Sequence, residues 1–192
     1  LYHDKLKKDP PFMRFILLGF QSTGKSTLIE RILKFPMNIV AEGTGTKCPL
    51  YVTCLHDDKS TEPVCTLTVP GRETNEACNI KVEEVFREVT HYNRTLVEFS
   101  DECIRLTVKW NRVQNMVFVD LPGIIANKST GKDNRGEIKR ILQMELRKAH
   151  TQPLVLLEPK EFATNSIVDF MDDATGSRQN WISNATFIMT KA

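Results

Sequence analysis

The chain has 192 residues, of which 41% are hydrophobic and 26% are charged, and its formal net charge at pH 7 is +2. These values predict one globular domain with a sizeable core, and they exclude the strongly basic composition of many nucleic-acid-binding domains. No apolar run approaches the ~20 residues of a membrane-spanning helix, no signal-peptide pattern precedes the first strand, and no C-x-x-C pair occurs among the five cysteines, so we expect a cytoplasmic protein with reduced thiols.

The first predicted element is a buried strand over Met13–Leu18, followed by a helix over Thr27–Leu33. Between them the sequence G-F-Q-S-T-G-K-S-T forms a complete phosphate-binding loop, G-x-x-x-x-G-K-[ST]. Backbone N–H groups and a helix N-terminus hold phosphate in such a loop. We therefore expect Lys25 at the terminal phosphates and Ser26 on Mg²⁺. The nucleotide-binding residues expected here are Gly19, Gln21, Ser22, Thr23, Gly24, Lys25, Ser26 and Thr27.

The segment Gly43–Pro49 reads G-T-G-T-K-C-P, which is typical of a nucleotide-dependent switch. In a GTPase switch, a threonine hydroxyl binds Mg²⁺, its backbone holds the attacking water, and the γ-phosphate orders the segment. We assign this role to Thr46, with Thr44 as the alternative.

The middle of the chain predicts a strand over Leu50–Leu55 and a pair of strands, Val64–Val69 and Cys103–Trp110. Within Cys103–Trp110, apolar and polar residues alternate from Ile104 to Trp110, which predicts a sheet edge with one side in solvent. Between the paired strands, apolar residues at helical spacing predict an amphipathic helix over Asn79–Phe99.

A short apolar strand over Met116–Val119 runs directly into the motif D-L-P-G, Asp120 to Gly123. An aspartate at the carboxyl end of such a strand can hold Mg²⁺ through a water. The backbone N–H of Gly123 can meet a γ-phosphate. This motif therefore supplies the second half of the predicted nucleotide site.

The remaining elements are a polar loop over Ser129–Gly136, helices over Arg135–His150 and Ser166–Met171, and strands over Leu154–Leu157 and Thr186–Thr190. Strands that alternate with helices predict an α/β fold, with a mostly parallel sheet flanked by helices. The last strand leads into Thr190-Lys191, which could begin a guanine-reading loop [NT]-K-x-D. The aspartate of that loop is not in the sequence, so guanine specificity is an inference.

Four motifs together resemble the dynamin superfamily of large GTPases: Gln21–Ser26, Thr46–Pro49, Asp120–Gly123 and Thr190-Lys191. The resemblance implies a P-loop GTPase domain over residues 1–192, incomplete in its last strand and base-reading segments, with a dynamin-like insertion at Asn79–Trp110. It further implies a GTP-hydrolysing motor or switch domain of a membrane-remodelling protein. Such a domain forms homodimers, and the full protein self-assembles and is recruited to a membrane through segments outside this chain.

The resemblance also implies a mechanism, because Ile124 stands where Ras-like enzymes use a glutamine to orient water. Dynamin-like proteins are similar in using the glutamine of the phosphate loop, here Gln21, while the switch threonine holds the water. They can also bind K⁺ or Na⁺ between the loop serine, here Ser22, and carbonyls near Gly43 and Gly45. The expected catalytic residues are Gln21, Ser22, Lys25, Thr46 and Gly123, and the Mg²⁺ ligands are Ser26, Thr46 and, through water, Asp120.

Three alternatives stay open. The chain could be a nucleotide-gated scaffold with little turnover, or an ATP-using P-loop enzyme such as a kinase or an ATPase. It could also be another large GTPase, guanylate-binding or septin-like, although the Gln-Ser pair and D-L-P-G disfavour this.

Overall fold

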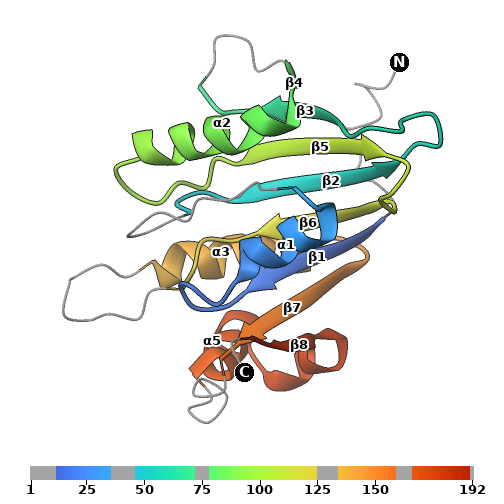
Figure 1. Cartoon of the computed structure of the whole chain (residues 1–192). Helices are drawn as coiled ribbons and strands as arrows, with labels where there is room; N and C mark the ends of the chain where they lie inside the picture. Colours follow the sequence, from blue (N-terminus) through green and yellow to red (C-terminus); the bar gives the residue numbers. More distant parts are fainter. Residues whose placement is uncertain (1–11, 36–45, 72–77, 125–133, 159–165, 191–192) are drawn as a thin grey trace.

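The computed structural model describes residues 12–35, 46–71, 78–124, 134–158 and 166–190. These residues form an eight-stranded sheet in the order β4-β3-β5-β2-β6-β1-β7-β8 (Figure 1). The strands are β1 (Met13–Leu18), β2 (Leu50–His56), β3 (Val64–Thr68), β4 (Cys78–Ile80), β5 (Ile104–Trp110), β6 (Met116–Asp120), β7 (Thr151–Leu157) and β8 (Thr186–Met189). The helices are α1 (Lys25–Leu33), α2 (Val82–Thr95), α3 (Arg135–Leu146) and α5 (Ser166–Thr175), with short 3₁₀ turns η2 (Arg178–Asn180) and η3 (Ile182–Asn184).

The sheet is mixed, and its parallel half carries the phosphate-binding loop. Strand β1 pairs in parallel with β6 and β7, and β7 pairs in parallel with β8. Strand β2 is antiparallel to β6, and β5 is parallel to β2. Strands β3 and β4 add two antiparallel pairings. Because β1 and β6 run side by side in the same direction, their carboxyl ends bring Gly19 and Asp120 to one edge of the sheet.

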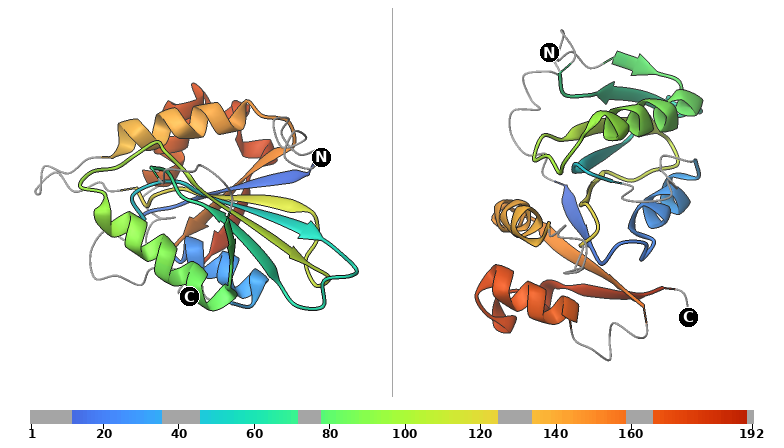
Figure 2. Two further views of the ribbon diagram at one scale, coloured as in Figure 1. Left: turned by 90° about the horizontal axis from the view of Figure 1, so that it is seen from above. Right: turned by 90° about the vertical axis from the view of Figure 1, so that its left-hand side faces the viewer.

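Helices cover the sheet in two layers, with α1 and α2 on one face and α3 and α5 on the other (Figure 2). Ile29 and Leu33 of α1 and Val85 and Val89 of α2 belong to one buried cluster. Residues of α3 and α5 belong to a second cluster. Successive residues of β1 alternate between the clusters, as the pleat of a strand requires. This central strand is therefore buried on both faces and reads as a continuous apolar run.

The prediction of a sheet edge at Cys103–Trp110 is wrong. Strand β5 lies inside the sheet, between β3 and β2. Its alternating pattern is real, because Ile104, Leu106 and Val108 are buried while Arg105 is exposed. The buried cluster beneath α3 and α5 includes no described residue from β3 or β5, so these helices do not cover the second face of β5. An interior strand that is covered by helices on one face alone shows the same alternation as an edge strand.

The helix predicted over Asn79–Phe99 is shorter at both ends. Residues Cys78–Ile80 form β4, which pairs with β3, and the backbone is extended again at Leu96. Ile80 and Leu96 pack against the same buried cluster as the helix without belonging to it, so periodicity alone overestimates the length of the helix.

Other boundaries also move. Helix α3 ends at Leu146 rather than at His150. His150 has a left-handed backbone (φ +58°) and leads into β7, which begins at Thr151, three residues before the predicted Leu154. Helix α5 continues to Thr175, beyond the predicted Met171. Helix α1 begins two residues early, at Lys25, because Gly24 (φ +87°) turns the chain into the helix.

All five cysteines are free thiols, and three of them are buried. Burial raises the pKa of Cys48 and Cys54 to about 12, and that of Cys65 to about 11. These buried thiols therefore stay protonated, and thus unreactive, at neutral pH.

A buried carboxylate joins β1, β2 and α3. Glu145 is 1% exposed and pairs with Arg14 at 2.9 Å. It also accepts hydrogen bonds from the Tyr51 hydroxyl and from Lys148 at 2.6 Å. Burial opposes ionisation of Glu145, but hydrogen bonds from Lys148, Tyr51 and Arg14 outweigh it and lower its pKa.

We expect Glu145→Gln to reduce the free energy of unfolding at pH 7 by about 3 kcal/mol, because it leaves the buried Arg14 charge without its carboxylate. The lowered pKa makes this contribution complete above the ordinary glutamate pKa of 4.5 and lost as pH falls through the folded-state value. Urea unfolding at pH 7 and at acid pH measures both effects. Glu137→Gln, an exposed change on the same helix, is the control. Equal losses in the two variants would contradict the assignment.

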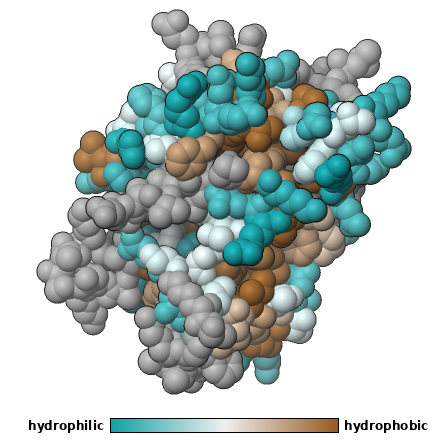
Figure 3. Space-filling view, viewed as in Figure 1, coloured by the Kyte–Doolittle hydropathy of each residue, from teal (hydrophilic) through white to brown (hydrophobic). Residues whose placement is uncertain are grey.

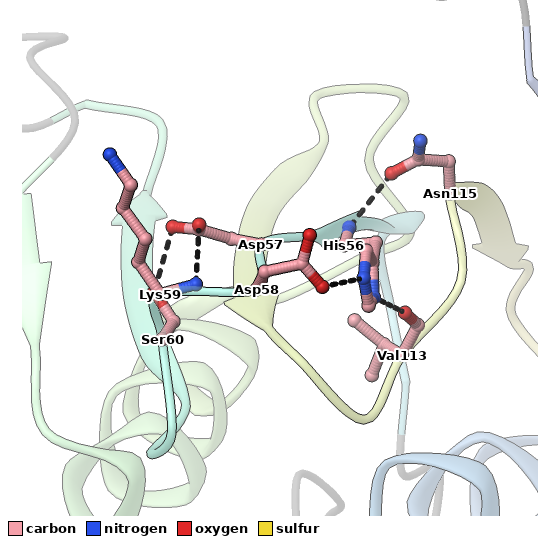
Figure 4. Close-up of polar contacts among 7 residues, drawn as sticks. All are labelled: His56, Asp57, Asp58, Lys59, Ser60, Val113 and Asn115. Atoms are coloured by element: carbon pink, nitrogen blue, oxygen red, sulfur yellow. Dashed lines mark hydrogen bonds and ion pairs between the residues drawn. The ribbon is translucent and has the colours of Figure 1, made fainter.

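At the end of the sheet opposite the phosphate-binding loop, His56 ties two turns together (Figure 4). Its Nε2 lies 2.9 Å from Asp58 Oδ1, and its Nδ1 lies 3.0 Å from the Val113 carbonyl oxygen. Both partners are acceptors, so the ring can donate to both only when it is protonated. The hydrogen bond to Asp58, and then that to Val113, raises the pKa of His56.

Candidate functional site

The loop after β1 closes tightly on itself. The backbone N–H and hydroxyl of Thr23 both donate to the Phe20 carbonyl, at 3.4 and 2.9 Å. A side chain at Gly19 would place its Cβ 2.5 Å from the Thr23 hydroxyl oxygen and 2.7 Å from the Leu156 carbonyl oxygen. Ser22 adopts a left-handed conformation (φ +67°) that non-glycine residues rarely take. The loop is thus held in one strained, compact shape.

The loop leads directly into α1, so the N-terminus of this helix, with its partial positive charge, faces the loop. Gly24 is the N-cap and has no side chain that could bond to the first N–H groups of the helix. The Leu28 N–H donates to the Gly24 carbonyl at 3.0 Å, so the N–H groups of Lys25, Ser26 and Thr27 come before the first intrahelical bond. Such a helix start attracts anions.

The ammonium group of Lys25 lies over the same loop. Its Nζ donates to the carbonyls of Gly19 at 3.2 Å and Phe20 at 3.0 Å, and the residue is 7% exposed. A buried cation beside a helix N-terminus is a strong site for phosphate.

The D-L-P-G segment packs directly against this loop. The Gln21 N–H donates to the Ile124 carbonyl at 3.3 Å, and the Ile124 N–H donates to the Gly19 carbonyl at 3.2 Å. A Cβ added to Gly123 would lie 2.7 Å from Gln21 Cα. The backbones of Gly123 and Gln21 are therefore in contact, although the two residues are 102 positions apart in the sequence.

Asp120 and Ser26 meet at the bottom of the site. The Ser26 hydroxyl donates to Asp120 Oδ2, whereas Oδ1 of the same carboxylate is buried without a hydrogen-bond partner. Asp120 is 1% exposed, and burial raises its pKa, although Lys25 and the Ser26 hydroxyl act in the opposite direction. A buried carboxylate oxygen without a partner, next to a hydroxyl, suits a hard cation such as Mg²⁺.

Asn134 is a residue of this site that the sequence analysis missed. It is the N-cap of α3 and is 1% exposed, and its side-chain amide donates to the Gly123 carbonyl at 2.9 Å. The amide thus fixes the D-L-P-G glycine instead of capping its own helix. In the sequence, Asn134 looks like an ordinary residue of the predicted polar loop over Ser129–Gly136.

The predicted switch and base-reading residues are only partly described. Thr46 is half-buried and precedes Lys47, whereas Gly43, Thr44, Gly45 and Lys191 lie outside the described residues. Thr190 follows β8, and its N–H and hydroxyl both donate to the Leu157 carbonyl, at 2.8 and 3.2 Å. Because β8 and β7 are parallel to β1, Thr190 lies at the same edge of the sheet as the loop.

The structure therefore brings five predicted residues together: Gln21, Lys25, Ser26, Asp120 and Gly123. The functional roles of these five residues, and of the other predicted site residues, stay predictions. In the described part of the chain, no cluster of three or more His, Cys, Asp or Glu residues could hold a metal. No helix in the described ranges is long and apolar enough to cross a membrane.

Comparison with known proteins gives a consistent result. The family model described as "Dynamin family" matches residues 16–191. Dynamin-like protein ARC5 of Arabidopsis thaliana is 26% identical over 164 residues, covering 82% of this chain and 20% of that protein. Interferon-induced GTP-binding protein MxB of Danio rerio is 27% identical over 157 residues, covering 79% and 25%. Dynamin-like GTPase OPA1, mitochondrial, of Danio rerio is 31% identical over 129 residues, covering 62% and 12%. The chain spans a quarter or less of these three relatives.

Proposed function

This chain belongs to the dynamin family, and on that premise we propose that it binds GTP with Mg²⁺ at the Gly19–Thr27 loop and hydrolyses it to GDP and phosphate. We further propose that residues 1–192 are part of the motor domain of a membrane-remodelling GTPase. The observation that carries the proposal is the Ser26–Asp120 contact, with Asp120 Oδ1 buried and without a partner beside Lys25.

Ser26 and Asp120 are the proposed holders of Mg²⁺, Asp120 through a water, and Thr46 is the third. When bound, Mg²⁺ supplies positive charge that neutralises the phosphate oxygens. The backbone N–H groups at the start of α1 and the Lys25 ammonium supply the rest of the positive potential. We assign contact with the γ-phosphate to the backbone N–H of Gly123, which lies against Gln21.

Hydrolysis needs a group that orients water, and Ile124 cannot serve, because it is aliphatic and 2% exposed. Gln21 is exposed at the same place, and its backbone is fixed by Ile124 and Gly123. We assign water orientation to the Gln21 carboxamide and the holding of that water to Thr46. Thr190 and Lys191 are assigned to the guanine side.

Calorimetry with Mg²⁺-GTP and Mg²⁺-ATP, followed by single-turnover phosphate release, tests the proposal. We expect GTP to bind in preference to ATP and to be hydrolysed. Binding without phosphate release would indicate a nucleotide-gated scaffold. Preference for ATP would indicate an ATP-using P-loop enzyme, and no uptake of either nucleotide would refute the site itself.

We assign a monovalent cation, K⁺ or Na⁺, to Ser22 and to carbonyls near Gly43 and Gly45. The strained backbone of Ser22 (φ +67°) supports this role, because strain of this kind clusters at functional sites. We expect kcat to be higher in potassium or sodium salt than in choline salt. An identical kcat in all three salts would remove the cation from the mechanism.

We also propose that two copies pair through this domain, and that a cytoplasmic full-length protein self-assembles and is recruited to a membrane by segments outside this chain. The relatives MxB, named as a GTP-binding protein, and OPA1, named as a dynamin-like GTPase, support the GTP-binding part of this proposal. Pairing predicts that specific activity rises with protein concentration. A specific activity that is constant over a wide concentration range would indicate a self-sufficient monomer.

A further inference from the structure

The residue after the proposed switch threonine is fixed at three points. The Lys47 N–H donates to the side-chain oxygen of Asn93 at 2.8 Å. The Lys47 carbonyl accepts from the Ser100 N–H at 3.0 Å, and the Lys47 ammonium donates to the Leu96 carbonyl. All three partners belong to the last turn of α2 or to the loop that follows it.

Asn93 is built into this contact. It is 3% exposed, and its side-chain nitrogen donates to the Val89 carbonyl one turn earlier in α2, at 3.0 Å. Its side-chain oxygen also accepts a weak bond from the Cys48 thiol, with the sulfur at 3.8 Å. The amide can therefore turn neither end toward water, and its oxygen stays directed at Lys47.

The Lys47 ammonium meets the carboxyl end of α2. Leu96 is the C-cap of this 14-residue helix, and carbonyls at a helix C-terminus carry partial negative charge that attracts cations. Charge and backbone hydrogen bonding thus hold Lys47 at the same place on α2.

From this geometry we propose that Asn93 is a positioning residue for GTP hydrolysis: through the Lys47 backbone it sets the position of Thr46, so that α2 controls the water-holding side of the site. The inference rests on the proposed function, because it presumes that Thr46 acts on the attacking water. It assigns a role to α2, which lies across the sheet from α3 and presents a largely hydrophilic outer face (Figure 3). A ligand that shifted the end of α2 would change turnover without touching the nucleotide.

The alternative is that Asn93 only satisfies buried backbone groups and stabilises the fold. The two interpretations differ in what they predict for catalysis. A purely structural residue changes stability and leaves kcat of the folded fraction unchanged. A positioning residue lowers kcat while GTP affinity stays the same, because the phosphate-binding loop is not altered.

The test is Asn93→Ala, measured by single-turnover hydrolysis, GTP calorimetry and hydrogen exchange of the Thr46–Leu50 segment. We expect kcat to fall about tenfold, which corresponds to the loss of one well-made hydrogen bond, with GTP affinity unchanged within about twofold. Exchange of the Lys47 amide should become faster. Asn93→Asp keeps an acceptor for the Lys47 N–H and should restore most of kcat.

Thr90→Val is the matched control on the same helix, because the Thr90 hydroxyl is buried without a hydrogen-bond partner and is not in the contact. It should leave kcat and Lys47 exchange unchanged. If Asn93→Ala does not fold, Asn93→Leu takes its place, because leucine fills the same buried position without an acceptor for the Lys47 N–H, and it should lower kcat in the same direction. Wild-type kcat in folded Asn93→Ala or Asn93→Leu would overturn the positioning role alone. Absence of GTP hydrolysis by the wild-type protein would instead overturn the proposed function.

Discussion

Lys25→Ala should lower the affinity for Mg²⁺-GTP by about 100-fold or more. The Lys25 ammonium lies over the loop, 3.0 and 3.2 Å from two loop carbonyls, where it can reach bound phosphate. Charge-assisted hydrogen bonds in a buried site each contribute about 1.5–3 kcal/mol, and two such bonds account for a loss of this size. Titration calorimetry with GTP measures the change directly.

The control for Lys25→Ala is Arg31→Ala. Arg31 is exposed and lies in the last turn of the same helix. Arg31→Ala therefore removes one positive charge far from the loop. Its GTP affinity should stay within about twofold of wild type, since exposed charges act weakly over such distances. If both variants bind GTP as the wild type does, Lys25 does not contact the phosphates and the proposed site is wrong.

Gln21→Ala should bind GTP normally but hydrolyse it about 100 to 1,000 times more slowly. This is the usual loss when a single group that acts in the transition state is removed. The Gln21 backbone takes part in the loop and remains in the variant, so the binding surface is preserved. Single-turnover phosphate release at saturating GTP isolates the chemical step from binding.

Gln114→Ala provides the comparison for Gln21→Ala, because Gln114 is an exposed amide in the turn between β5 and β6. It should leave both affinity and turnover unchanged. Wild-type turnover in Gln21→Ala would assign the orienting of water to another group, while the GTP-binding role would stand.

Much of the fold and half of the site could be predicted because their signals are local. The phosphate-binding loop and D-L-P-G are contiguous motifs, and the strands that carry them are buried on both faces, so they appear as apolar runs. The alternation of strands and helices predicts that much of the sheet is parallel, but it does not predict that β1 lies beside β6. The two motifs suffice to place Lys25, Ser26 and Asp120 in one predicted site.

The positions of Asn93 and Asn134 could not be predicted, because their partners are distant in the sequence. Asn134 reaches Gly123 across a loop, and Asn93 reaches Lys47 from another element. Asn93 does leave a trace, since it occupies the place four residues after Val89 where the apolar stripe of α2 would continue. A polar residue in a buried stripe indicates a specific partner, but the sequence does not identify it.

The sheet-edge error has a similar cause. Alternation along β5 reports which faces are covered, and it carries no information on whether a neighbouring strand is present. Two of the three residues of strand β4 fall within the predicted helix, because so short a strand has no period to detect.

The absence of space between Gly123 and Gln21 links two events of the proposed cycle. No methyl group fits between them, and the Gln21 N–H donates to the Ile124 carbonyl, so a displacement of the D-L-P-G segment would also disturb the glutamine. Departure of the cleaved phosphate would release Gly123, and the same movement would take the Gln21 carboxamide out of the position in which it orients water. If hydrolysis proceeds as proposed, the glutamine would return to its working position only when the next triphosphate binds Gly123.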